Sequence, residues 1–95
     1  MWDDGIGSHE RKTIRIRVTV HGMLTAAVDD PSGILDIVVP EGTDVQGLVE
    51  ILSERSPLFD PRACFGLIDG ARVPGDMLLR DGQQVNLYLM FGGGY

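Results

Sequence analysis

Hydrophobic and polar residues alternate where the chain first becomes periodic. Between residues 13 and 20 the apolar side chains stand at every second position: Ile14, Ile16, Val18 and Val20. A period of two is the pattern of a strand with one buried face. We therefore predict a strand over residues 13–20, a short helical turn at residues 24–28, and a second strand over residues 34–39. Pro40 ends this second strand, because proline cannot donate a hydrogen bond in a central ladder.

After the second strand the apolar spacing becomes that of a helix. The positions i, i+3, i+4 and i+7 are held by Val45, Leu48, Val49 and Leu52. We predict that Thr43 caps this helix, that Gln46 completes a capping box, and that the helix ends near Arg55, before a Ser-Pro pair. Gly47 costs about 1 kcal/mol relative to alanine inside a helix, which indicates a close approach of the helix to a sheet.

Tight turns divide the rest of the chain into strands. Strands are predicted at residues 64–68 and 71–73, around the hairpin dipeptide Asp69-Gly70, and at residues 84–91, after the turn Asp81-Gly82. The last strand directs Val85, Leu87 and Leu89 toward the core, with Phe91 in the same phase at its end, and directs Asn86, Tyr88 and Met90 outward.

The order strand, strand, helix, strands, strand defines the expected fold. A helix that joins two strands of one sheet crosses over right-handed, and here the first and last strands become parallel neighbours when both lie centrally. We predict an α+β fold, a mixed four- to five-stranded sheet crossed by one main α-helix, which is the β-grasp or ubiquitin-like arrangement. The domain would span residues 13–91, between a disordered leader at residues 1–12 and a flexible glycine-rich tail at residues 92–95.

Composition and charge narrow the function classes. The 95 residues carry a net charge of −6, which disfavours nucleic acid and fits either a basic protein partner or solubility alone. No apolar run approaches the ~20 residues of a membrane span, and the acidic start lacks a secretory signal pattern. We expect a cytoplasmic protein that does not bind membranes. The single cysteine, Cys64, excludes an intrachain disulfide and is either an apolar filler or a reactive thiol.

The sequence shows no catalytic constellation. It has no Ser/His/Asp set, no acid pair in an evident cleft, and no glycine loop that opens a helix. His9 and His21 are too few to indicate a metal site. We therefore expect no catalytic residue, no metal and no bound cofactor. The candidate chemistry lies in the tail, because three glycines without side chains can lie extended in a narrow channel of another protein.

Several segments together resemble the MoaD/ThiS family of sulfur carriers, which includes the small subunit of molybdopterin synthase. The resemblance covers roughly residues 13–94 and depends on the order and spacing of four pieces. These are the helix entry Pro-Glu-Gly-Thr at residues 40–43, residues 53–57, the turn and strand at residues 81–85, and the glycine tail. The helix entry and the long first hairpin resemble MoaD more than ThiS.

The resemblance implies a carrier that is acted on by an activating enzyme. In the family, a MoaD/ThiS-type adenylyltransferase uses ATP to adenylate the terminal glycine, which then receives sulfur as a thiocarboxylate. By position, Gly93 and Gly94 match the terminal pair of the family and Gly92 is an added flexible residue. A further partner would be the large subunit of molybdopterin synthase, where the carrier serves that pathway.

Two departures from the family pattern keep other interpretations open. Tyr95 follows the glycine pair, so activation requires a peptidase that removes it, and Leu89-Met90-Phe91 stands where molybdopterin-type carriers commonly have prolines. Tyr88, Met90 and Phe91 form a docking patch or are exposed incidentally. The alternatives are a ubiquitin-like modifier conjugated to lysines and a non-covalent binding subunit with an inert tail.

Overall fold

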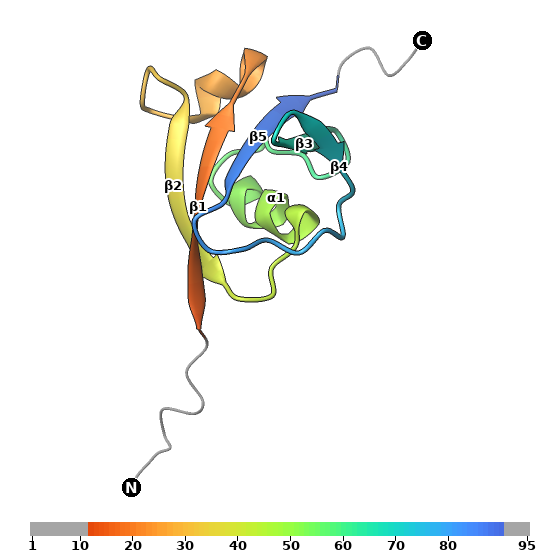
Figure 1. Ribbon diagram of the computed structural model, residues 1–95. Helices are drawn as coiled ribbons and strands as arrows, with labels where there is room; N and C mark the ends of the chain where they lie inside the picture. Colours follow the sequence, from red (N-terminus) through yellow and green to blue (C-terminus); the bar gives the residue numbers. More distant parts are fainter. Residues whose placement is uncertain (1–11, 91–95) are drawn as a thin grey trace, which may run out of the picture.

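The computed structural model describes residues 12–90, so the predicted leader, apart from Lys12, and the predicted tail lie outside the described residues (Figure 1). The elements in chain order are β1 (Thr13–Val20), the 3-10 helix η2 (Gly22–Ala27), β2 (Ile34–Pro40), α1 (Val45–Ser53), β3 (Cys64–Ile68), β4 (Ala71–Val73) and β5 (Gln84–Leu89).

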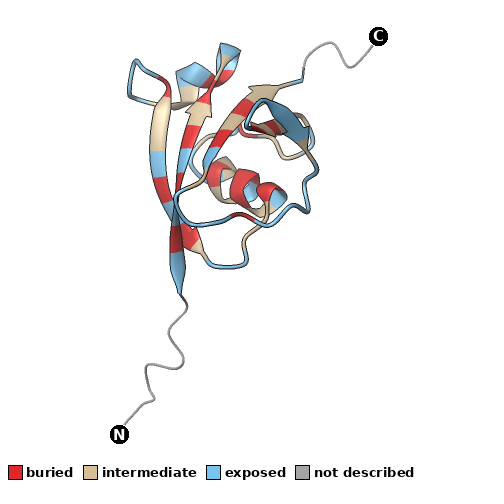
Figure 2. Ribbon diagram, viewed as in Figure 1, coloured by how far each residue is buried: buried red, intermediate tan, exposed pale blue. Residues whose placement is uncertain are grey.

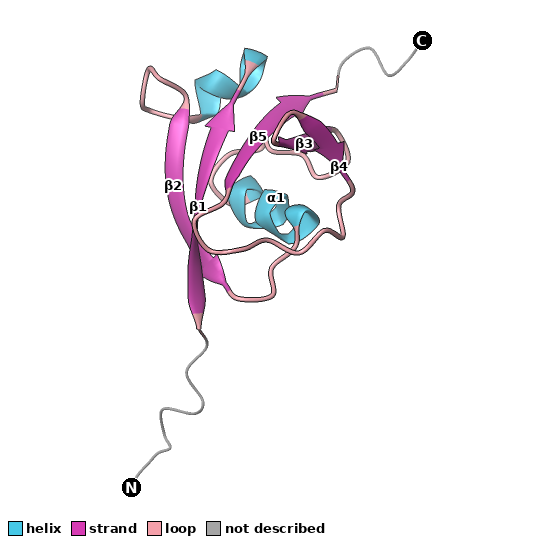
Figure 3. Ribbon diagram, viewed as in Figure 1, coloured by secondary structure: helices cyan, strands magenta, loops and turns pink. Residues whose placement is uncertain are grey.

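The strands form one sheet in the order β2-β1-β5-β3-β4. β1 pairs antiparallel with β2 and parallel with β5, and β3 pairs antiparallel with both β5 and β4. The parallel pair β1 and β5 is thus central, and α1 crosses the sheet (Figure 3). This arrangement confirms the predicted α+β β-grasp fold.

The core lies between α1 and the inner face of the sheet (Figure 2). Alternate residues of β1 are buried as predicted, and so are the four apolar positions of the helix stripe. Phe59 is also a core residue, with 1% of its surface exposed, although it lies in the loop after α1. Burying such a side chain contributes about 1.5–3 kcal/mol to folding. The described residues contain no buried polar or charged side chain.

The predicted helix cap was wrong by one residue. Asp44 is the N-cap, and its Oδ1 accepts a hydrogen bond from the Gly47 N–H at 2.7 Å. The Thr43 hydroxyl instead donates to the Pro40 carbonyl at 2.6 Å. Gln46 does not complete a capping box; its amide nitrogen lies 3.5 Å from a carboxylate oxygen of Glu50.

The interpretation of Gly47 was also wrong. A Cβ at this position would lie 3.1 Å from Asp44 Oδ1 and 3.2 Å from a methyl group of Thr43, so the cap crowds it rather than the sheet. The close approach of helix and sheet occurs at Gly66 of β3. A Cβ there would lie 3.4 Å from methyl groups of Val45 and Val85.

Other boundaries differ modestly from the predictions. The helical turn expected at residues 24–28 is the 3-10 helix η2, the helix α1 ends at Ser53 rather than near Arg55, and β5 ends at Leu89. The predicted hairpin is present, with positive φ at both Asp69 and Gly70, as a type I′ turn requires. Among the described helices, none has the length and apolarity needed to cross a bilayer.

Candidate functional site

The candidate site is the sheet face opposite the core, at the end of β5. β5 lies between β1 and β3, and its buried residues Val85 and Leu87 point to the core. The alternation of the strand therefore places Tyr88 on the opposite face. Tyr88 is half-buried and Met90 is 45% exposed. Phe91 and residues 92–95, which include the predicted activation residues Gly93 and Gly94, lie outside the described residues.

Tyr88 is the centre of a row of stacked side chains. Its ring lies 4.4 Å from the ring of His21 at an interplanar angle of 3°, and 5.5 Å from the ring of Phe65 at 16°. The Arg72 guanidinium lies 4.5 Å from the Phe65 ring centroid. We call these four residues the aromatic row. An aromatic pair contributes about 0.5–1.5 kcal/mol in addition to the energy gained by burying its surface. The stacked contacts therefore stabilise the aromatic row.

The strand register produces the aromatic row. Phe65 is paired with Tyr88 across β3 and β5, and Leu67 is paired with Arg72 across β3 and β4. His21 follows the end of β1, and its Nε2 lies 3.0 Å from Asn86 Oδ1. No sequence pattern singled out Phe65 and Arg72, although the alternation of β3 is consistent with an outward Phe65.

The two central rings of the row have neighbours on both sides. Both faces of Phe65 and Tyr88 are occupied, because each ring lies between two members of the row. Nucleobases bind to exposed ring faces, which Phe65 and Tyr88 do not offer. A rigid patch of aromatic edges beside an exposed methionine is the surface that a protein partner can bury.

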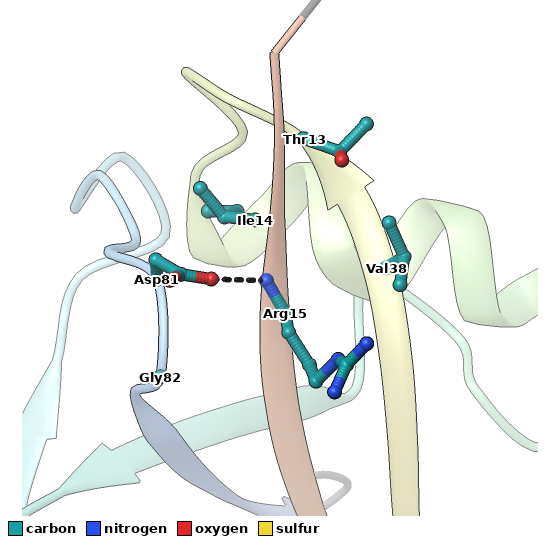
Figure 4. A pocket seen from close by; sticks show the side chains of 6 residues that line it. All are labelled: Thr13, Ile14, Arg15, Val38, Asp81 and Gly82. Atoms are coloured by element: carbon teal, nitrogen blue, oxygen red, sulfur yellow. Dashed lines mark hydrogen bonds between the residues drawn. The ribbon is translucent and has the colours of Figure 1, made fainter.

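A second candidate site lies at the opposite end of β1, and its side chains have a structural role. A shallow cavity of about 340 Å³ is lined by residues that include Arg15, Val38 and Asp81 (Figure 4). Asp81 Oδ1 accepts a hydrogen bond from the Arg15 backbone N–H at 2.8 Å, and the Gly82 N–H donates to the Arg15 carbonyl at 2.7 Å. The Asp81-Gly82 turn therefore attaches the start of β5 to β1.

One exposed ion pair and the single cysteine have local partners. Arg17 Nε donates to Asp36 Oδ1 at 2.9 Å, and this hydrogen bond lowers the pKa of Asp36. Cys64 packs against the core, its Sγ lies 3.8 Å from the Leu58 carbonyl oxygen, and burial raises its pKa. Within residues 12–90, no three His, Cys, Asp or Glu side chains gather as a metal site.

Comparison with known proteins identifies the fold. The sequence matches no protein-family profile and no curated protein. A Pyrococcus furiosus protein described as molybdopterin converting factor, subunit 1, has a similar structure, with TM-score 0.66 and 23% identity over 81% of this chain and 98% of that one. The small archaeal modifier protein 1 of Haloferax volcanii gives TM-score 0.66 and 14% identity over 81% and 98% of the two chains. A Caldiarchaeum subterraneum ubiquitin gives 0.62 and 17% over 87% and 100%.

These structural similarities define the fold class of the protein. The chain has the ubiquitin-like β-grasp fold, and its described residues form the whole of that fold, from β1 to β5.

Proposed function

We propose that this protein is a β-grasp sulfur carrier whose Gly94 carboxylate is activated after loss of Tyr95. The observation that carries the proposal is the position of β5. This strand is central in a ubiquitin-like sheet, and in the sequence it continues within three residues into Gly92-Gly93-Gly94. The similarity to a molybdopterin converting factor subunit supports the molybdopterin pathway, with thiamine-type sulfur transfer as the alternative.

The proposed chemistry takes place on the partner enzyme. A carboxylate is a poor electrophile, so an oxygen of the Gly94 carboxylate attacks the α-phosphorus of ATP and pyrophosphate leaves. Hydrosulfide then attacks the acyl carbon, AMP leaves, and loss of the sulfur-bound proton gives a thiocarboxylate. The three residues of the tail that remain after loss of Tyr95 reach roughly 10 Å at ~3.3 Å per residue, which lets Gly94 enter a pocket while the folded domain stays outside.

The aromatic row supports a docking role for Tyr88, Met90 and Phe91. Tyr88 is fixed between His21 and Phe65, so little side-chain entropy is lost when a partner covers it. The proposed partners are an ATP-dependent activating enzyme and, in the molybdopterin pathway, the large subunit of the synthase. A peptidase that removes Tyr95 is a further proposed partner.

The second candidate function is that of a ubiquitin-like modifier conjugated to lysines. The similarity to an archaeal modifier protein and to a ubiquitin favours it. The same activated glycine serves both functions. Gly-Gly remnants linked to lysines of cellular proteins would favour the modifier, and their absence under several growth conditions would count against it.

Intact-protein mass spectrometry tests the carrier. Three chains, ending at Tyr95, Gly94 and Gly93, are incubated with ATP, a sulfide source and the activating enzyme of the source cell. We expect the mass gain of an oxygen-to-sulfur exchange only in the chain that ends at Gly94. We also expect native cells to contain that form. Native chains that all end in Tyr95, together with no mass change in any of the three, would refute the proposal.

A further inference from the structure

The chain carries one lysine, Lys12, one cysteine, Cys64, and seven arginines. An amine and a thiol are side-chain groups that attack an activated carboxylate readily. A guanidinium stays protonated in proteins and does not. If Gly94 is activated as proposed, its acyl carbon would be open to attack by nucleophiles of its own chain. The positions of Lys12 and Cys64 therefore bear on how long the activated group lasts.

The end of β5 determines what the tail can reach. The Met90 N–H donates to the Ala63 carbonyl at 2.7 Å, so the last described residue lies next to the start of β3. From Met90 to Gly94 the chain adds four residues, which span at most roughly 13 Å at ~3.3 Å per residue. The acyl carbon of Gly94 can meet only side chains that extend to within this distance of Met90.

Lys12 lies at the far end of the sheet from the tail. It precedes β1, whose other end, Val20, is paired with Leu87 of β5. The chain from Lys12 to Val20 spans about 26 Å at ~3.3 Å per residue. Met90 lies further on in the same direction, because β1 and β5 are parallel (Figure 1). Lys12 is exposed, but it lies outside the reach of the tail of its own domain.

Cys64 lies close to the tail but its side chain faces the core. Its backbone is paired with Leu89, next to Met90. The side chain packs against the core, and its Sγ lies 3.8 Å from the Leu58 carbonyl oxygen. The neighbouring Phe65 is the residue of β3 that stacks on Tyr88, on the other face. The sheet therefore separates the thiol from the face that carries Tyr88.

The basic side chains near the tail are arginines. Arg62 precedes Ala63, its side chain is 92% exposed, and its Nε lies 3.5 Å from Asp60 Oδ1. Arg72 lies on β4, two strands away from β5, which is about 10 Å at ~4.8 Å per strand. A lysine at either position would offer an amine within reach of Gly94. Arginine provides the same charge without that nucleophile.

We propose that the fold keeps the amine of Lys12 and the thiol of Cys64 away from the activated Gly94, and that an arginine at position 62 is part of this protection. The proposal rests on the proposed activation of Gly94. It leaves the acyl group to nucleophiles from outside the chain, such as hydrosulfide. With lysine at position 62, the amine would attack the acyl carbon, the leaving group would depart, the amine would lose a proton to solvent, and an internal amide would remain.

The test uses the full chain ending at Gly94, prepared as a thioester of mercaptoethanesulfonate, so that activation needs no enzyme. At about pH 8.5 a small fraction of lysine amines is neutral, and we expect the unsubstituted chain only to hydrolyse. Arg62→Lys should form the internal amide at least about tenfold faster than Arg15→Lys, because a short tether raises the effective concentration of the amine. Arg15 is also exposed, and it lies near the far end of β1, so Arg15→Lys is the matched control.

Intact-protein mass spectrometry distinguishes the products, since the internal amide is lighter than the hydrolysed chain by one water molecule. In guanidinium the thioester should transfer to Cys64, because unfolding exposes the thiol. An internal amide in the folded, unsubstituted chain would overturn the proposal. So would a folded internal product that hydroxylamine cleaves, which is a thioester at Cys64, equal rates in the two variants, or no transfer in guanidinium. Failure of enzymatic adenylation would refute the proposed function and leave these results unchanged.

Discussion

At the residue scale, Asp44 shows how one carboxylate sets the start of α1. Its Oδ1 satisfies a backbone N–H that the first turn of a helix leaves without an internal partner. We predict that Asp44→Ala lowers the free energy of unfolding by about 1 kcal/mol, within the roughly 0.5–2 kcal/mol typical of N-cap losses. Chemical denaturation monitored by circular dichroism measures this.

Gln46→Ala is the matched control for the cap. A capping box would make this substitution costly, whereas the Gln46 side chain here only reaches Glu50 at 3.5 Å on an exposed face. A pair of this kind contributes about 0.2–0.5 kcal/mol. A loss at Gln46 as large as the loss at Asp44 would contradict this assignment of the cap.

Cys64 gives the second prediction at this scale. Burial raises its pKa, so the thiolate fraction at a given pH is smaller than that of a free thiol, whose pKa is about 8.5. The rate of alkylation by iodoacetamide should rise with pH along a curve whose midpoint lies above that of a free thiol, and should increase when the protein is unfolded in guanidinium. A rate profile with its midpoint at or below that of a free thiol would restore the reactive-thiol interpretation.

At the scale of elements, the contact between β3 and α1 depends on Gly66. Space for one methyl group exists there at 3.4 Å from the side chains of Val45 and Val85, but a branched side chain would overpack the contact. We predict that Gly66→Val destabilises the protein by about 1–3 kcal/mol, as is typical for overpacked cores. Gly66→Ala should change stability far less. Thermal and urea denaturation of both variants measures the difference, and equal stabilities would contradict the close approach.

The elements also show what the sequence can and cannot predict. β1, β3 and β4 have the predicted bounds because alternation and turn residues are local signals. Phe59 was missed because it lies in a loop, where no period marks a buried position. The aromatic row depends on the register between β3 and β5, which joins residues far apart in the chain. The shift of the cap from Thr43 to Asp44 reflects a competing hydrogen bond from Thr43 to Pro40.

At the scale of the whole molecule, two parts would cooperate in the proposed function: the face of the sheet that carries Tyr88, and the tail that carries Gly94. The three candidate functions use these parts differently. A carrier and a modifier need both. A non-covalent binding subunit needs only the face. A comparison of one variant in each part therefore separates the third function from the first two.

We predict that Tyr88→Glu in a chain ending at Gly94 lowers the rate of adenylation by the activating enzyme at least about tenfold, because the charge would be desolvated in the docked complex. ATP–pyrophosphate exchange measures this rate. Thr13→Glu adds the same charge on the same outer face of the sheet, at the opposite end of β1 from the aromatic row, and is the control. Deletion of Gly93 and Gly94 should abolish the exchange while leaving binding to the enzyme within about threefold, a difference of only ~0.6 kcal/mol. If the deleted chain instead retained the biological function and only Tyr88→Glu lost it, the protein would be a binding subunit whose glycines have no chemical role.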